Sequence, residues 1–322
     1  MSEPRSAAGL HVLVLAGGLS YEREVSLRSG RRAVDALRGA GVDAVLHDAD
    51  ATLIPTLVAD PPDAVLIALH GGSGEDGSLR AILDLAGVPY VGADARSARL
   101  AWDKPAAKAV LRSAGVPTPD WVALPQDRFS ELGGAAILGR VTAGMGLPVI
   151  VKPAQGGSGL GVTPVTTAEG LPAAMVSCFG YDSTALVERF VPGVDVAVSV
   201  VDRGNGPEAL PPVEITPHAG VYDYAARYTA GLTTWHAPAR LAPETLARVQ
   251  ELAVRAHVAL GLRDLSRVDL IVPSEGDPQV LEVNVAPGLT ETSLLPMAVS
   301  AAEWNFGELL AVLTRRAADT KR

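Results

Sequence analysis

The sequence predicts an α/β protein whose N-terminal part is an open parallel β-sheet. Apolar runs at residues 11–16, 44–47 and 64–69 are typical of buried strands, and a helical run at 29–39 separates the first two. Strands that alternate with helices in this way form parallel sheets. The chain has 322 residues, of which 48% are hydrophobic, so it is long enough for two or three domains with their own cores.

Two polar residues follow predicted strands at positions where ligands usually bind. Glu22 comes after the first strand and the turn at Gly17 and Gly18, and His70 directly follows the third strand. In open parallel sheets, ligands lie at the carboxyl ends of the strands, so both residues are candidates for a binding site. The alternatives are that Glu22 only favours a helix N-terminus through its charge, and that His70 has a structural role.

A glycine-rich loop follows a strand in the middle of the chain. Residues 147–152 form a predicted strand that ends with Lys152, and the next segment, 156–161, contains four glycines together with Ser158. The backbone N–H groups of such a loop, that of Gly157 among them, can surround a phosphate, and Lys152 adds a point charge beside it. A plain hairpin turn is the alternative.

Three further segments surround this loop in the sequence. Residues 97–114, which include Lys104, are predicted to form one helix, and the proline-rich residues 116–119 indicate a linker after it. Residues 222–228 are aromatic and charged without any periodicity, which favours a loop that covers a substrate.

Two more strands are predicted at residues 184–191 and 194–201, and they carry Glu188 and Asp195. An amphipathic helix is predicted at residues 243–260. These elements extend the α/β pattern over the second half of the chain.

Three oxygen ligands are predicted to converge on two short apolar strands near the C-terminus. Asp269 opens the run 270–272, and Glu282 and Asn284 lie two residues apart on the next run. Side chains two apart on a strand point to the same face, and hard oxygen donors of this kind suit Mg²⁺. The alternative is an acidic sheet face in contact with solvent.

Residues beside this acidic group could act on an anion. Arg267 either forms an ion pair with the carboxylates or faces a transferring phosphoryl group. After Asn284, a turn containing Gly288 leads to Ser293 and the apolar Leu294. A helix that begins there would offer free backbone N–H groups to an anion.

Composition limits the class of partner. The formal net charge is −9 and the sequence pI is near 5.2, so bulk electrostatics give no support to nucleic acid or an anionic membrane as a partner. Cys178 is the single cysteine, which excludes an intramolecular disulfide and a thiolate metal cluster. No signal peptide or membrane span is evident, so we expect a cytoplasmic protein.

The order of several short motifs resembles D-alanyl-D-alanine ligases of the ATP-grasp superfamily over nearly the whole chain. The motifs are Gly-Gly-x-Ser-x-Glu-Arg-Glu-Val-Ser at 17–26, Ala-Leu-His-Gly at 68–71, Val-Lys-Pro at 151–153, Tyr-Asp-Tyr at 222–224, Arg-Val-Asp at 267–269 and Leu-Glu-Val-Asn at 281–284. The resemblance implies an ATP-grasp fold. A Rossmann-like substrate-binding domain at 1–96 would precede two α+β domains, at 97–187 and 188–322, that hold ATP between them.

The resemblance also implies the reaction. ATP phosphorylates the carboxylate of a first D-alanine, and the amine of a second D-alanine attacks the acylphosphate through a tetrahedral intermediate. Two Mg²⁺ ions, for which Mn²⁺ can substitute, would be held by Asp269, Glu282 and Asn284. The implied nucleotide-binding residues are Lys104 and Lys152 at the phosphates, Glu188 at the adenine amino group, Asp195 at the ribose, and Gly157, Ser158 and Arg227.

The remaining roles that the resemblance implies concern the amino acids. Glu22 would bind the first ammonium group, with His70 beside the first D-alanine. Ser158 and Tyr228 would form a hydrogen-bonded link to Glu22. Arg267 and the Gly288 N–H would stabilise the oxyanion. Ser293 and the Leu294 N–H would bind the carboxylate of the second D-alanine.

This sequence departs from the family pattern at three positions, and two other functions remain open. The phosphate loop reads Gly-Gly-Ser-Gly at 156–159, Asp195 replaces a glutamate, and Arg227 replaces a lysine. One rival function is an ATP-dependent ligase that makes another dipeptide for secondary metabolism, and the other is a nucleotide-binding protein without turnover. We expect a homodimer that binds D-alanine and ATP, with no nucleic-acid or membrane partner.

Overall fold

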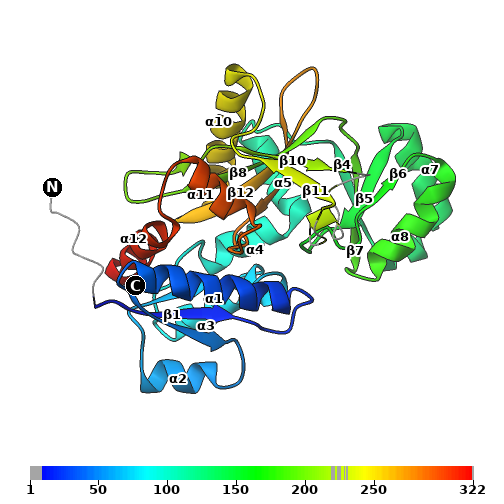
Figure 1. The fold of residues 1–322 in the computed structure, drawn as a ribbon. Coiled ribbons are helices and arrows are strands. Elements are labelled where there is room, and N and C mark those ends of the chain that lie inside the picture. Colours follow the sequence, from blue (N-terminus) through cyan, green and yellow to red (C-terminus); the bar gives the residue numbers. More distant parts are fainter. Residues whose placement is uncertain (1–8, 219–221, 223–225, 228, 230, 321–322) are drawn as a thin grey trace.

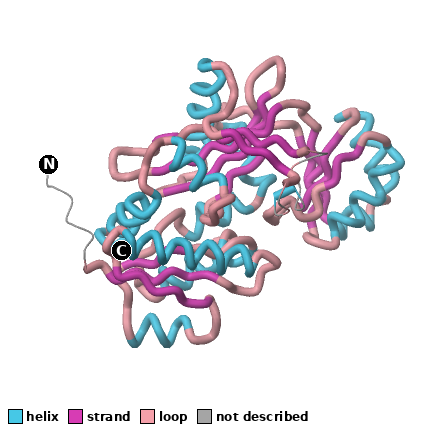
Figure 2. The backbone as a smooth tube through the Cα atoms, in the orientation of Figure 1, coloured by secondary structure: helices cyan, strands magenta, loops and turns pink. Residues whose placement is uncertain are grey.

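The computed structural model describes residues 9–218, 222, 226–227, 229 and 231–320. Three β-sheets, each covered by helices, follow one another along the chain (Figure 1). The C-terminal helix α12 (Phe306–Asp319) returns to the N-terminal sheet, where it packs against α1 (Arg23–Gly39) (Figure 2). The mixed α/β architecture that the sequence predicts is confirmed.

The N-terminal sheet is parallel, with strand order β2-β1-β3, as predicted. Its strands are β1 (His11–Ala16), β2 (Asp43–Asp48) and β3 (Ala64–Ile67). Alternate residues of β1 face opposite sides: Val12 and Val14 pack with α1 and α12, whereas Leu13 and Leu15 pack under α2 (Leu53–Ala59) and α3 (Ser78–Leu85). An unbroken apolar strand is therefore required, because helices cover both faces.

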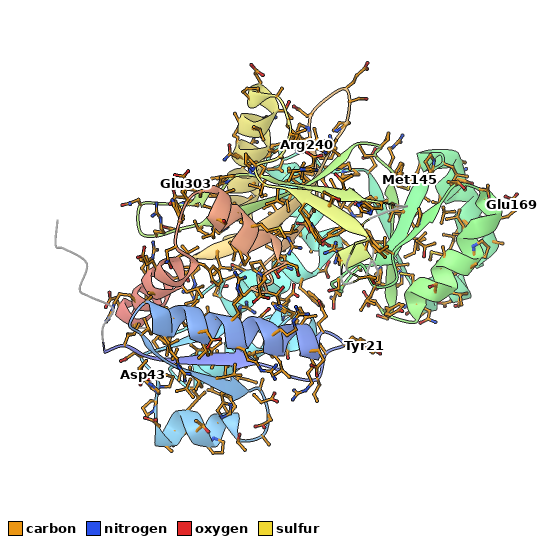
Figure 3. The ribbon with its side chains drawn as sticks, viewed as in Figure 1. Tyr21, Asp43, Met145, Glu169, Arg240 and Glu303 are labelled. Carbon is orange, nitrogen blue, oxygen red and sulfur yellow. The ribbon has the colours of Figure 1, made fainter. Side chains whose placement is uncertain are left out.

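The two ends of this layer have different surroundings. Figure 3 shows Tyr21 at the N-terminal end of α1, and Asp43 at the opposite end of the layer, where β2 begins. Because α1 connects β1 to the parallel strand β2 and runs back along the sheet, its first turn lies at the carboxyl ends of the strands. Glu22 and His70 both lie at this edge, and the 3₁₀-helix η1 (Gly72–Gly74) follows His70.

The second sheet is antiparallel and has the order β4-β7-β5-β6. Its strands are β4 (Trp121–Pro125), β5 (Val149–Pro153), β6 (Thr163–Val165) and β7 (Thr184–Arg189). One face packs against α7 (Gly134–Met145) and α8 (Leu171–Phe179) through a core that includes Val151, Val187 and Met175. Because side chains alternate along a strand, Lys152 and Glu188 point away from this core to the other face. The short helices α6 (Gln126–Glu131) and η2 (Ala168–Gly170) complete this part.

The third sheet is antiparallel, with strands in the order β11-β10-β8-β12-β13 and β9 paired to β8. The strands are β8 (Val194–Val201), β9 (Glu208–Ala209), β10 (Val213–Pro217), β11 (Thr233–His236), β12 (Leu265–Val272) and β13 (Gln279–Asn284). Its inner face packs on α10 (Pro243–Ala259) through residues such as Val198, Val268 and Leu252. The short helix α11 (Leu294–Ala301) packs on the opposite face.

The prediction of a single helix at residues 97–114 is wrong. Two helices occupy this region, α4 (Ala95–Trp102) and α5 (Lys104–Ser113), and Asp103 between them has an extended backbone. The Asp103 carboxylate accepts a hydrogen bond from the Ala106 N–H, and Pro105 stands in the first turn of α5. An N-cap aspartate and a proline both favour a new helix start, so the sequence itself ends the first helix here.

The three-domain division stays a proposal. The boundary at residues 187 and 188 falls within β7, and α12 from the third predicted unit covers the sheet of the first. Among the described residues, no helix is long and apolar enough to cross a membrane.

Candidate active site

Two neighbouring cavities lie where the three sheets approach one another. The first is lined by residues from the N-terminal layer and the α11 end, which include Glu22, His70, Glu75, Arg267 and Ser293. The second lies between the two antiparallel sheets and is lined by, among others, Lys152, Glu188, Asp195, Asp269 and Leu281. Residues lining both cavities join them: Lys104, Gly156, Gly157, Tyr222, Arg227 and Glu282. A molecule in one cavity therefore lies next to a molecule in the other.

Glu22 is buried at the start of α1 and contacts the glycine-rich loop. Ser158 donates a hydrogen bond from its hydroxyl to Glu22 Oε1. A Cβ built on Gly157 would lie 3.2 Å from Glu22 Oε2, and one on Gly71 would overlap that oxygen. Glycine at 71, where φ is 65°, therefore leaves space for the carboxylate as well as adopting a left-handed backbone.

His70 has both ring nitrogens engaged in the protein. Its Nδ1 lies 3.1 Å from the Ala286 carbonyl oxygen, which can only accept, so Nδ1 carries the hydrogen, while Nε2 lies 2.8 Å from the Ser29 hydroxyl. Burial lowers the pKa of His70 to about 4, so the ring is neutral. The imidazole lines the first cavity and also joins the N-terminal layer to the segment after β13.

Glu75 is a buried carboxylate of the first cavity that the motifs did not indicate. Its Oε1 accepts a hydrogen bond from the Gly71 N–H at 2.8 Å, and the side chain is 6% exposed. Burial, followed by the nearby Glu22 charge, raises the pKa of Glu75 to about 7. Two buried carboxylates at one site favour a bound cation, because a positive group relieves both burial and repulsion.

Four predicted site residues share one face of the third sheet. Arg267 is the register partner of Asn284, and Asp269 is the partner of Glu282, on the antiparallel strands β12 and β13. Residues two apart point to the same side, so all four side chains lie together. Asp269 was expected to open its strand, but β12 already begins at Leu265. The longer strand follows from the pairing of β12 with β8 along its whole length.

Both carboxylates of this face form ion pairs with basic side chains. The Arg267 guanidinium donates from Nε and Nη2 to the two oxygens of Asp269, at 2.7 and 2.8 Å, and Lys104 Nζ lies 3.3 Å from Glu282 Oε2. Burial opposes ionisation of Glu282, but Lys104 and Arg227 outweigh it and lower its pKa to about 2. Glu282 is therefore a permanent anion at the junction of the cavities.

The donor set fits Mg²⁺ in its chemistry. Two carboxylates that are direct cross-strand neighbours, with the Asn284 amide on the same face, are hard oxygen donors of the type this ion prefers. The Asn284 oxygen already accepts a hydrogen bond from the Ala286 N–H at 2.7 Å, which fixes the amide orientation. Within the described part of the chain, no group of three or more His, Cys, Asp or Glu side chains is arranged to hold a metal. An ion would therefore need further oxygens from a ligand such as a phosphate.

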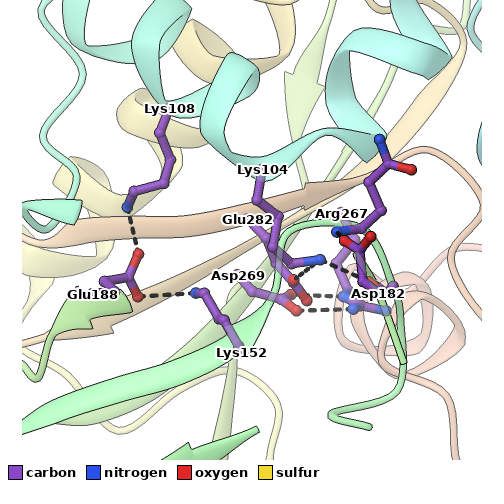
Figure 4. A network of polar contacts seen from close by, with 10 residues as sticks. Lys104, Lys108, Lys152, Asp182, Glu188, Arg267, Asp269 and Glu282 are labelled. Carbon is purple, nitrogen blue, oxygen red and sulfur yellow. Dashed lines mark hydrogen bonds and ion pairs between the residues drawn. The ribbon is translucent and has the colours of Figure 1, made fainter. Parts of the chain in front are cut away.

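Glu188 pairs with two lysines at the second cavity, and Lys104 stands apart from them beside Glu282 (Figure 4). Lys152 Nζ lies 2.9 Å from Glu188 Oε1, and Lys108 Nζ lies 2.5 Å from Glu188 Oε2. Lys104 donates to the Gly156 carbonyl at 2.6 Å, so it holds the glycine-rich loop. Lys108 was not among the predicted site residues. Burial lowers its pKa to about 8, although Glu188 acts in the opposite direction.

The predicted covering loop is described only in part. Arg227 lies over the Tyr222 ring at 4.4 Å from its centroid, and both residues line both cavities. Tyr228 lies outside the described residues. Asp195, on the floor of the second cavity, has its pKa raised to about 6 by burial and then by Asp269.

The residues before α11 form a compact turn at the first cavity. The helix α11 begins at Leu294, as predicted, with Ser293 as its N-cap. The Ser293 hydroxyl accepts a hydrogen bond from the Thr290 N–H at 3.1 Å. A Cβ on Gly288 would lie 2.5 Å from Ser293 Oγ, so a larger residue there would displace the Ser293 hydroxyl. Arg32 donates to the Leu289 and Thr290 carbonyls at 2.8 and 2.6 Å and ties this turn to α1.

Comparisons with known proteins agree over almost the full length. The model of the family described as "D-ala D-ala ligase C-terminus" matches residues 110–315. A D-alanine–D-alanine ligase from Desulforudis audaxviator is 41% identical over 305 residues, which cover 94% of this chain and 97% of the relative. The chain belongs to the D-alanine–D-alanine ligase family.

Solved structures of similar proteins have the same fold. The D-alanine–D-alanine ligase of Bacillus anthracis in complex with ATP aligns with a TM-score of 0.78 and 30% identity, covering 97% of this chain and 98% of that one. The VanG D-Ala:D-Ser ligase of Enterococcus faecalis aligns with a TM-score of 0.80 and 30% identity, covering 94% and 97%. The predicted ATP-grasp fold and the enzyme class of ATP-dependent ligase are thereby confirmed, because both are properties of this family.

Proposed function

We propose that this chain joins two D-alanine molecules into D-alanyl-D-alanine at the expense of ATP, which supplies a dipeptide for peptidoglycan precursors. The observation that carries the proposal is the pair of joined cavities, one with buried carboxylates and one with paired lysines, which meet at Lys104, Gly157 and Glu282. An amino acid in the first cavity would present its carboxylate to a nucleotide in the second.

In the first step, a carboxylate oxygen of the first D-alanine attacks the γ-phosphorus of ATP. A bond forms between that oxygen and phosphorus, the bond from the γ-phosphorus to the β–γ bridging oxygen breaks, and ADP leaves. Glu22 would hold the substrate ammonium group, with Glu75 behind it and His70 beside the substrate. Lys104 and Lys152 would neutralise phosphate charge, because phosphoryl transfer depends on positioning and charge neutralisation. Glu188 and Asp195 would bind the adenine amino group and the ribose.

Magnesium ions, when bound, would neutralise the phosphates and hold them in place, with Asp269, Glu282 and Asn284 as their protein ligands. The metal would take the place of protein cations at these carboxylates: Lys104 would transfer from Glu282 to a phosphate oxygen, and Arg267 would release at least one oxygen of Asp269. The backbone of Gly157, the Ser158 hydroxyl and Arg227 would close over the nucleotide.

In the second step, the amine of the second D-alanine attacks the acylphosphate carbon. A tetrahedral intermediate forms, the nitrogen loses a proton, which leaves with the phosphate, and the carbon–oxygen bond to phosphate breaks, releasing inorganic phosphate and the peptide. Arg267 and the Gly288 N–H would stabilise the oxyanion, as fixed donors do in such reactions. Ser293 and the Leu294 N–H would bind the second carboxylate at the N-terminus of α11.

The second substrate is tested together with the reaction. The purified chain is incubated with Mg·ATP and D-alanine, and phosphate release is measured while mass spectrometry identifies the product. D-serine and D-lactate are offered in competition with D-alanine, because one similar structure is that of a D-Ala:D-Ser ligase. D-alanyl-D-alanine as the main product supports the proposal, whereas a dominant mixed product would assign a different second substrate.

We also propose a homodimer in the cytoplasm, which sedimentation and cell fractionation would test.

A further inference from the structure

Lys108 lies behind the second cavity and does not line it. It stands four residues after Lys104 on α5, so both side chains leave the same face of the helix. The Lys108 residue is 1% exposed, and its Nζ lies 2.5 Å from Glu188 Oε2 and 2.5 Å from the Thr118 hydroxyl. The Nζ is also 5.1 Å from the centroid of the Trp121 ring. These contacts fix the ammonium group from three sides.

The carboxylate of Glu188 is divided between two lysines of different accessibility. Its Oε1 pairs with Lys152 at 2.9 Å, and its Oε2 pairs with Lys108. Lys152 lines the second cavity, where a nucleotide phosphate would attract it, whereas Lys108 does not line this cavity and is held by Glu188 and Thr118. If Lys152 moves to a phosphate, Glu188, which is only 3% exposed, depends on its remaining partners. A buried carboxylate that loses its cation is strongly destabilised.

We propose that Lys108 is a positioning residue that keeps Glu188 charged and directed into the nucleotide cavity while Lys152 transfers to the phosphates of ATP. The inference rests on the proposed function, in which Glu188 accepts from the adenine amino group and Lys152 binds phosphate. In a chain without Lys108, Lys152 must stay with Glu188 or leave an unpaired buried carboxylate. Recognition of the base and binding of the phosphates would then compete.

The test compares Lys108→Met with Arg112→Met as its matched control. Arg112 lies one helical turn further on α5 and also stacks on Trp121, at 4.3 Å from the ring centroid, but it pairs with the exposed Asp120 and not with Glu188. Calorimetry measures the Kd of Mg·ATP, and steady-state kinetics measure the KM values for ATP and D-alanine. We expect Lys108→Met to weaken ATP binding roughly 10- to 100-fold, because a hydrogen bond to a charged group is lost. The KM for D-alanine should stay within about 3-fold of the wild-type value. The control should change neither constant by more than about 2-fold.

A second readout separates positioning from a general structural role. The preference for ATP over ITP, which lacks the amino group on its base, should fall in Lys108→Met, because Glu188 is no longer aimed at that group. Thermal unfolding shows whether the variant is folded. A folded Lys108→Met chain with unchanged ATP affinity and an unchanged ATP-to-ITP preference would overturn the proposal.

A double variant keeps the proposal testable if Lys108→Met does not fold. Lys108→Met/Glu188→Gln contains no unpaired carboxylate and is compared with Glu188→Gln alone. We expect the double variant to bind ATP no more than about 3-fold more weakly than Glu188→Gln, because Lys108 acts only through the Glu188 charge. A much weaker double variant would contradict the inference. The calorimetric arm needs no turnover, so a chain that binds ATP but forms no dipeptide refutes the proposed function, while the Kd comparison still decides the role of Lys108.

Discussion

Ser158 in the glycine-rich loop donates a hydrogen bond to Glu22, which lies 136 residues earlier at the start of α1. The contact closes the loop over the first cavity and connects the second sheet to the N-terminal layer. Since Glu22 and Ser158 are both buried, the bond forms away from bulk water, where a hydrogen bond to a charged group contributes most.

The Ser158→Ala variant should therefore lose activity while keeping its fold. Removing a hydrogen bond to a charged, buried partner costs about 1.5 to 3 kcal/mol, so we expect kcat/KM for D-alanine to fall roughly 10- to 100-fold. Ser177→Ala, at an exposed position on α8, serves as the control and should behave as wild type. Equal kcat/KM values for the two variants would show that the contact has no part in turnover.

The carboxylates on β12 and β13 provide the second prediction. Asp269→Asn and Glu282→Gln each remove one negative charge with little change in volume, so turnover should fall at least about 100-fold while the circular dichroism spectrum is unchanged. Glu275→Gln, in the exposed turn between the same strands, is the control. Near wild-type rates of either site variant at limiting Mg²⁺ would refute these residues as metal ligands.

Glu75 should make stability depend on pH. Its pKa is raised to about 7 in the folded chain from an ordinary value near 4.5, so the folded state holds a proton that the unfolded state has released. The free energy of unfolding should thus fall by on the order of 2 to 3 kcal/mol as pH rises from about 4.5 to 7, and then level off. Urea unfolding of wild type and Glu75→Gln at pH 5 and 7.5 measures this.

The expected outcome is that Glu75→Gln lacks this loss and is the more stable chain at pH 7.5. Glu24→Gln, an exposed substitution on α1, should reproduce the wild-type pH dependence. If the Glu75→Gln and wild-type curves run parallel between the two pH values, Glu75 does not hold the extra proton.

Tyr228 provides a prediction about the second substrate. In the proposed site, a phenol at position 228 would hydrogen-bond Ser158 and keep the link to Glu22, whereas a phenyl ring would not. We expect wild type to form D-alanyl-D-lactate poorly at neutral pH, and Tyr228→Phe to raise the ester-to-amide ratio up to about tenfold, the effect of one hydrogen bond. Competition of D-alanine against D-lactate, with both products quantified, measures the ratio. A wild-type preference for the ester would contradict the assignment.

Local pattern was sufficient to predict the elements that one segment of sequence specifies. The strands His11–Ala16 and Val194–Val201 have the predicted bounds. After His11 the first is a continuous apolar run, and the second is a valine-rich run whose polar residues, Asp195 and Ser199, fall on one face. The helical periodicity of residues 97–114 continues across the break between α4 and α5 and hides the capping signal of Asp103 and Pro105. The start of β12 was placed too late because its first four residues include the polar Ser266 and the charged Arg267. The Ser266 hydroxyl is buried against His257.

Glu75 and Lys108 were missed because their significance depends on tertiary contacts. Lys108 meets Glu188 from 80 residues away, and a lysine within an amphipathic helix gives no local sign of that partner. Glu75 follows η1 in a glycine-rich segment, where an acidic residue is ordinary. Its proximity to Glu22 exists only once the ends of β1 and β3 are side by side. The family motifs include surrounding positions, yet neither of these two residues lies within them.

One measurement tests the central claim most directly: the stoichiometry of ADP, phosphate and dipeptide formed by the purified chain from Mg·ATP and D-alanine. The account predicts one ADP, one phosphate and one D-alanyl-D-alanine per cycle, with no phosphate released when D-alanine is omitted. Nucleotide hydrolysis without dipeptide, or a chain that binds ATP and releases no phosphate with D-alanine, would contradict it.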